Sequence, residues 1–112
     1  MICKKPKTRA LHEAAIQVVL DHIEHNFTGD LDVEHLHEMT SLSRFHFHRV
    51  FHELTGATPG QYVRRKRLDH SMSLLRAGEK DLAVLARCAC YSSLSAFNRA
   101  FREQFGITPG TY

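Results

Sequence analysis

Apolar residues recur along most of this chain at the three- and four-residue spacing of an amphipathic helix. Between residues 11 and 27 they stand at positions 16, 19, 20, 23 and 27. Phe47, Val50, Phe51 and Leu54 then fall at i, i+3, i+4 and i+7, which is the pattern of one buried helical stripe. No segment has the alternation expected of a strand of useful length. The pattern therefore predicts an all-α fold of about seven helices.

A shorter apolar segment precedes each of two buried stripes, at 33–39 and at 82–89. Only residues 40–42 and 90–92 separate these segments from the stripes that follow. Two helices joined by so short a turn form a helix-turn-helix motif, so the sequence predicts two such motifs. The expected N-caps are Asp32 and Ser43 in the first motif and Asp81 and Ser93 in the second.

The chain contains an internal repeat with a period of 50 residues. Aligning 43–62 with 93–112 gives 10 identical pairs out of 20. The shared residues include the buried phenylalanines, an arginine on the opposite helical side and the ending GxTPGxY. A repeat of this density means that the chain is built from two copies of one small unit.

Both copies end in the same way. Gly56 and Gly106 follow the buried stripes at the point where a helix closes on a left-handed residue. The Thr-Pro pair after each glycine supplies the N-cap and first-turn proline of another helix, which bridges the two units in the first copy. The predicted organisation is a subdomain over about 9–58, a linker helix over about 59–77 and a second subdomain over about 79–112.

The composition is that of a small globular protein. The 112 residues are 43% hydrophobic and 24% charged, which excludes a disordered tail and a membrane protein. The basic start lacks the apolar core of a signal peptide, so the sequence predicts a cytosolic protein without membrane association. Cys3, Cys88 and Cys90 lack disulfide spacing, so we expect reduced thiols, the last two buried or half-buried. The net charge of +3 is compatible with an anionic partner.

The side opposite each buried stripe offers hydrogen-bond donors and apolar groups. In the first copy it carries Arg44, Phe45, His48, Arg49 and His52, and in the second Leu94, Ser95, Asn98, Arg99 and Arg102. A helix fits the DNA major groove, where arginine pairs with guanine, asparagine with adenine, and apolar groups contact thymine methyls. Such a contact would relieve the exposure of Phe45. A merely solvated face is the alternative, but an arginine at the same outward position in two helix-turn-helix motifs favours nucleic acid.

Four consecutive cations at 64–67 lie in the first turns of the bridging helix. Two of them at most can face one phosphate strand, and we assign Arg65 and Arg67 to it. Contacts of this kind set the affinity and its salt dependence without reading sequence. A solubilising patch is the alternative.

Other functional classes have weaker support. Nine histidines together with Cys88 and Cys90 raise the hypothesis of a metal or redox sensor, but their spacings match no zinc site. No Gly-rich phosphate loop, nucleophile elbow or acid–base cluster indicates an enzyme or a cofactor. A non-specific DNA-binding or protein-interaction module stays as the main alternative to sequence-specific binding.

Residues 36–62, with RxF at 49–51 followed by GxTP and Tyr62, resemble the DNA-binding domain of the AraC/XylS transcriptional regulators. Residues 85–112 resemble it more closely through SxxxFxRxFxxxFGxTPxxY. The likeness extends from about residue 14 to Tyr112 and is strongest to the MarA, SoxS and Rob group. It implies a sequence-specific transcriptional regulator that acts as an activator. Its DNA-binding domain is expected to be monomeric and to bind double-stranded DNA. Regulators of this type commonly contact RNA polymerase as well.

The resemblance also implies roles for individual residues. A long central helix would hold two recognition helices roughly 34 Å apart, so that they read successive segments of the major groove. Base reading falls to Phe45, His48, Arg49, Ser95, Asn98 and Arg99. Backbone or flanking contacts fall to Ser43, Arg44, Arg65, Arg67, Ser93, Leu94 and Arg102. Several of these residue types differ from those of relatives, so the preferred DNA sequence cannot be transferred.

The chain departs from the family pattern at two places. Relatives usually have a glycine inside each helix-turn-helix turn, where Ser41 and Cys90 stand here. If the backbone there needs a positive φ, a non-glycine residue costs on the order of 1 kcal/mol, and the second turn is expected to be looser or of another geometry. Tyr62 continues into the bridging helix whereas Tyr112 is the last residue, so we expect a fragment of a longer protein.

Overall fold

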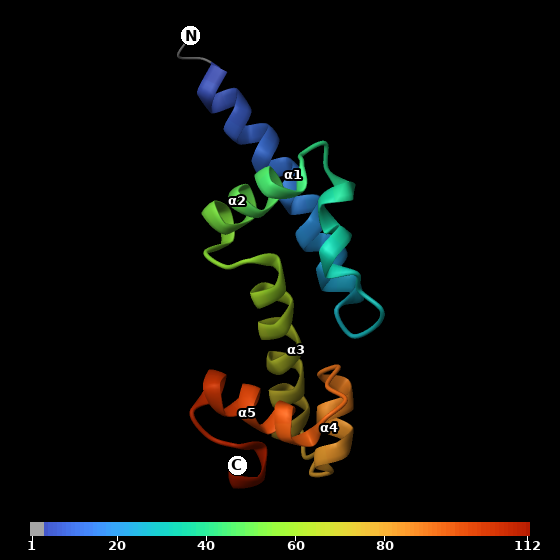
Figure 1. Cartoon of the computed structure of the whole chain (residues 1–112). Helices are drawn as coiled ribbons and strands as arrows, with labels where there is room; N and C mark the ends of the chain where they lie inside the picture. Colours follow the sequence, from blue (N-terminus) through green and yellow to red (C-terminus); the bar gives the residue numbers. More distant parts are fainter. Residues whose placement is uncertain (1–3) are drawn as a thin grey trace. The chain divides into compact units, whose positions relative to one another are not determined.

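The computed structural model describes residues 4–112, with side chains from residue 8 onward. Helices succeed one another over these residues without a strand (Figure 1), which confirms the predicted all-α class. The α-helices are α1 (Lys4–Asn26), α2 (Arg44–Thr55), α3 (Pro59–Arg76), α4 (Leu82–Cys88) and α5 (Leu94–Phe105). Two 3-10 helices, η1 (Val33–Met39) and η2 (Pro109–Thr111), complete the order. Cys3 lies outside the described residues.

The chain divides into two compact units. Unit 1 contains α1, η1, α2 and the start of α3 as far as Tyr62. Unit 2 contains residues 27–29, the rest of α3 from Val63, and α4, α5 and η2. Each unit therefore holds one of the two predicted helix-turn-helix motifs.

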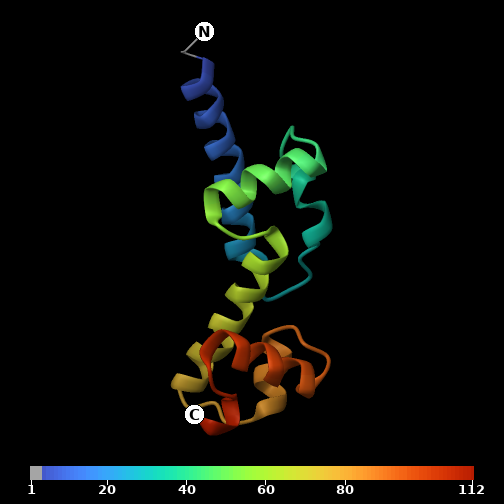
Figure 2. The same ribbon diagram turned by 60° about the vertical axis from the view of Figure 1, so that its left-hand side comes forward.

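The core of unit 1 forms where α1, η1 and α2 pack together, as Figures 1 and 2 both show. The buried side chains come from the predicted stripes: Ile16, Val19, Ile23, Leu36, Phe47, Val50 and Phe51. The short segment predicted at 33–39 forms a 3-10 helix that buries Leu36, while Met39 at its end is 41% exposed.

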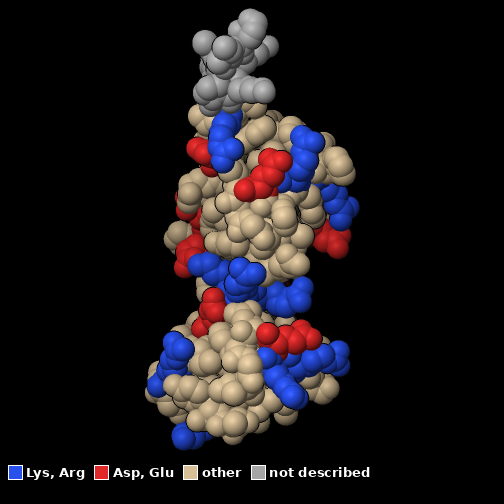
Figure 3. All heavy atoms as spheres, turned by 90° about the vertical axis from the view of Figure 1, so that its left-hand side faces the viewer, with Lys and Arg blue, Asp and Glu red and all other residues tan. Residues whose placement is uncertain are grey.

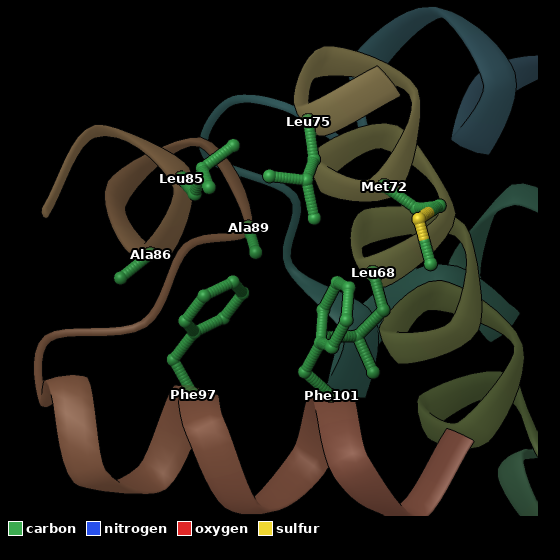
Figure 4. Close-up of a cluster of buried hydrophobic side chains, with 8 residues drawn as sticks. All are labelled: Leu68, Met72, Leu75, Leu85, Ala86, Ala89, Phe97 and Phe101. Carbon is green, nitrogen blue, oxygen red and sulfur yellow. The ribbon is translucent and has the colours of Figure 1, made fainter. Parts of the chain in front are cut away.

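The core of unit 2 lies between α3, α4 and α5. Phe97 and Phe101 project from α5 into the space between the other two helices (Figure 4). The remaining members of the cluster are Leu68, Met72, Leu75, Leu85, Ala86 and Ala89. Since three of these come from α3, the predicted linker helix is also a structural part of unit 2.

The predicted N-caps form in four cases out of six. Thr58 accepts from the backbone N–H of Gln61 at 3.1 Å, whereas Thr108 makes no side-chain cap hydrogen bond. Ser43 accepts a hydrogen bond from the backbone N–H of His46, and Ser93 accepts one from Ala96, both at 3.2 Å. Asp81 accepts from the N–H of Ala83 at 3.0 Å. The prediction was wrong for Asp32, which makes no cap hydrogen bond because its carboxylate is bonded to an imidazole instead.

That imidazole belongs to His35, whose Nδ1 lies 2.7 Å from Asp32 Oδ2. The hydrogen bond and the charge of Asp32 raise the pKa of His35 above its usual 6.5. A raised histidine pKa stabilises the folded chain below the pKa of the unfolded imidazole, and this contribution disappears as pH rises through the folded pKa. We expect Asp32→Asn to lower the His35 pKa, as measured by NMR titration of the ring. An unchanged midpoint would contradict the assignment.

The two helix-turn-helix turns differ in backbone conformation. Cys90 is the one non-glycine residue with a positive φ, 65°, within 4–112. Ser41 therefore does not adopt the left-handed conformation. A positive φ at the position where relatives have glycine therefore occurs only in the second turn. There Cys90 itself adopts the left-handed conformation that favours glycine. Gly56 and Gly106 are left-handed at φ 80°, as predicted.

This difference gives different expectations for one substitution at the two turns. Cys90→Gly relieves about 1 kcal/mol of strain, because glycine adopts a positive φ freely, and this gain offsets the added freedom of the unfolded chain, so the free energy of unfolding should change little. Ser41→Gly relieves no such strain and should lower the free energy of unfolding by roughly 0.5 to 1 kcal/mol through added freedom in the unfolded chain. Urea unfolding followed by circular dichroism measures both. Equal changes in the two variants would refute the role of φ.

Candidate nucleic-acid interface

The outer face of α2 is exposed as the sequence predicted. The helix buries Phe47, Val50 and Phe51 on one side. On the other side Arg44, Phe45, His48, Arg49 and His52 are all exposed. Phe45 is the extreme case at 80% exposure, which is a large apolar area to leave in water.

A shallow hollow of about 370 Å³ lies on this face and is lined by Arg44, Phe45 and His48. Arg44 also faces Glu34 of η1, with 3.5 Å between Nη2 and Oε1. Because both side chains are largely exposed, this ion pair contributes only about 0 to 1 kcal/mol and leaves Arg44 free to exchange partners. The hollow thus combines an aromatic surface with cationic and imidazole groups, which suits a base edge and its flanking phosphate.

The outer face of α5 is formed by the equivalent residues. Ser95, Arg99 and Arg102 are exposed, and Leu94 is 45% exposed. Arg99 occupies on α5 the position that Arg49 has on α2, 50 residues earlier. Each unit therefore presents an exposed guanidinium on the side of the helix that faces away from its own core.

Asn98 departs from the other members of this face because its amide is partly buried. Its Oδ1 is buried and has no hydrogen-bond partner. Bidentate pairing with adenine requires both ends of the amide, so this side-chain position leaves one end for DNA. The sequence could not show this, since helical spacing places a residue on a face without giving the depth of its individual atoms.

Ser43 and Ser93 combine two properties at the start of α2 and α5. Each hydroxyl oxygen accepts from the backbone at 3.2 Å, so its proton stays available for donation. The helix N-terminus beside it carries a partial positive charge that attracts anions. These serines can therefore contribute to phosphate binding while they cap the helices.

The basic run at the start of α3 is divided between surface and structure. Arg65 is exposed. Arg67 donates from Nε to the carbonyl of Phe27 at 2.7 Å and from Nη2 to that of Gly29 at 3.4 Å. Arg67 thus anchors the loop after α1, a role that the sequence did not indicate because the partners lie about 40 residues away. Figure 3 shows further basic side chains on each unit, several of them beside acidic ones.

A polar contact joins α3 and α5 within unit 2. Gln104 donates through Nε2 to Asp69 Oδ1 at 2.8 Å and to the backbone carbonyl of Arg65 at 3.4 Å. The two hydrogen bonds of Gln104 fix α5 against the helix that carries the basic run.

Burial raises the pKa of Tyr91 above its usual 10, and the positive charges of Arg64 and Arg67 partly oppose this shift.

The histidines and cysteines that raised the metal hypothesis are spread over the described residues. No cluster of three or more His, Cys, Asp or Glu side chains capable of holding a metal occurs in the described part of the chain. Cys88 is half-buried as expected, but Cys90 is exposed. Within residues 4–112, none of the helices combines the length and apolar character needed to cross a bilayer.

Comparisons with known proteins agree with this geometry. A family model for a helix-turn-helix domain matches residues 36–112. The chain is 35% identical over 96 residues to LumQ of Photobacterium leiognathi, a probable transcriptional regulator, covering 85% of this chain and 39% of LumQ. It is 29% identical over 101 residues to the regulatory protein SoxS of Salmonella typhimurium, covering 90% of this chain and 94% of SoxS.

Among solved structures, the DNA-binding domain of the transcriptional factor AdpA, in complex with a target DNA, superposes with a TM-score of 0.74. The two chains are 31% identical, over 88% of this chain and 87% of that one. The chain spans less than half of the length of LumQ but nearly all of SoxS. By its matched helix-turn-helix domain and these relatives, the chain belongs to the AraC/XylS family of transcriptional regulators.

Proposed function

We propose that this chain binds a specific sequence of double-stranded DNA and thereby regulates transcription. The mode of regulation that we propose is activation. The single observation that carries the proposal is the equivalence of Arg49 and Arg99. Each is exposed on the outer face of a capped helix that follows a helix-turn-helix turn. The AdpA domain, which has the same fold, was solved with its target DNA.

In this proposal α2 and α5 enter successive segments of the major groove. Arg49 and Arg99 pair with guanines, and Phe45 covers a thymine methyl. His48 and Ser95 contact further base edges, and Asn98 makes a single hydrogen bond with the free end of its amide. The groups that hold the DNA backbone are Ser43, Arg44, Arg65, Arg67, Ser93, Leu94 and Arg102.

Arg65 and Arg67 have different weights in this arrangement. Arg65 is exposed, so it reaches a phosphate directly. The guanidinium of Arg67 donates hydrogen bonds to the backbone carbonyls of Phe27 and Gly29. Its contribution to DNA binding is therefore chiefly electrostatic. We place the protein in the cytosol, with the domain monomeric on DNA and RNA polymerase as a second partner.

Selection of binding sites from random duplexes tests the proposal. Sequence-specific binding predicts convergence on one asymmetric motif of roughly 20 base pairs, because two helices read successive major-groove segments. Binding that depends on salt concentration alone, with no recovered motif, would indicate a non-specific module. Absence of any binding would favour a protein-interaction module.

A further inference from the structure

Unit 2 contains a cavity of about 420 Å³ that the proposed DNA-binding residues do not line. The wall is built by the end of α3, the loop to α4, the first residue of α4 and η2. The residues that matter for its chemistry are Leu75, Arg76, Lys80, Leu82, Pro109 and Tyr112. A volume of this size lies in the range of small-molecule sites, roughly 300 to 1,000 Å³.

The inner part of this cavity is apolar. Leu75 is only 8% exposed and Pro109 is buried, while Leu82 is half-buried beside them. Leu75 and Leu82 also belong to or pack against the core cluster shown in Figure 4. The cavity is therefore a recess in the surface of the core of unit 2.

The outer part of the cavity is cationic. Arg76 and Lys80 are exposed, and neither makes an ion pair with a carboxylate of the described residues. The acidic groups next to them in sequence do not line the cavity, and each is held by the backbone: Glu79 accepts from the N–H of Asp81, and Asp81 from that of Ala83, each at 3.0 Å. The charged side chains that line the apolar recess are therefore two cations.

We propose that this cavity binds a small amphipathic carboxylate. The apolar body of the ligand lies on Leu75, Leu82 and Pro109, and its carboxylate pairs with Arg76 or Lys80. Charge and shape both select for this class, because a simple inorganic anion leaves the apolar surface uncovered and a neutral alcohol leaves both cations unpaired. A ligand that binds only the folded chain also stabilises it in proportion to its occupancy.

Octanoate is a suitable probe, with acetate as the charged control and octanol as the apolar control. In ¹⁵N-labelled protein without DNA, we expect octanoate at millimolar concentration to shift the amide signals of Gly78, Leu82 and Tyr112 in a saturable manner. Acetate should cause no saturable shift at the same concentration, and octanol should bind more weakly. Because no DNA is present, the result is independent of the proposed regulatory function.

The double variant Arg76→Gln/Lys80→Gln tests the cations directly. We expect it to weaken octanoate binding by about threefold to fivefold, because a charge contact made by an exposed side chain contributes little in water. Arg87→Gln removes an exposed cation of α4 that does not line the cavity and should leave binding unchanged. All three replaced side chains are exposed, so the variants should fold, which circular dichroism checks. The proposal is overturned by absence of saturable shifts, by shifts that map elsewhere, or by equal affinity in the double variant.

Discussion

Phe101→Ala is expected to lower the free energy of unfolding by about 3 to 5 kcal/mol, the usual cost of removing a fully buried aromatic side chain. Phe101 has 0% exposure and belongs to the unit 2 cluster, where it lies beside Leu68 in Figure 4. Its ring centroid is 5.7 Å from that of Phe97 and 4.6 Å from that of Phe105. Truncation to alanine therefore leaves a cavity between α5 and α3 that neighbouring rings cannot fill without losing their own contacts.

The chain provides a matched control in Phe45, the same residue type with 80% exposure. Phe45→Ala should change the free energy of unfolding by no more than about 0.5 kcal/mol, because an exposed ring loses little packing. Urea unfolding of the two variants gives this comparison. A loss in Phe101→Ala no larger than in Phe45→Ala would show that Phe101 is not a core residue.

The same pair separates stability from DNA binding. Phe45→Ala should weaken binding to the selected duplex while the protein stays folded, since the proposed loss is a contact with a thymine methyl. Phe101→Ala should weaken binding only to the extent that unit 2 unfolds. Phe101→Ala should thus have the larger effect on the free energy of unfolding, and Phe45→Ala the larger effect on DNA binding by the folded protein.

The features predicted best from the sequence are those determined by neighbouring residues. The caps at Ser43 and Ser93 and the left-handed Gly56 and Gly106 depend on a few adjacent positions, and all four are confirmed. The buried and exposed sides of α2 and α5 follow from helical periodicity.

Features that depend on packing or on distant partners could not be predicted. The hydrogen bonds of Arg67 connect residues about 40 positions apart, and no local sequence pattern predicts them. The buried Oδ1 of Asn98 depends on how its side chain lies against the protein. For the candidate site, sequence therefore identified the faces, while the structure identified which atoms on each face are available.

Arg49→Ala and Arg99→Ala should each weaken binding to the selected duplex by about 1 to 3 kcal/mol and relax the preference at one base position. A bidentate arginine–guanine pair supplies both affinity and discrimination, and each side chain is exposed on an outer helical face. The affected positions should differ between the two variants, because the arginines stand in different units. Fluorescence anisotropy on the selected duplex and on single-base variants measures both effects.

Arg65→Ala is the control for charge alone, since it also removes one exposed guanidinium. A phosphate contact carries no base information, so this variant should weaken all duplexes alike and reduce the slope of log K against log salt by about one. Base preference should stay as in the parent chain. If all three variants lose affinity equally on every duplex, the division between base-reading and backbone arginines is wrong, and α2 and α5 bind DNA only through their charge.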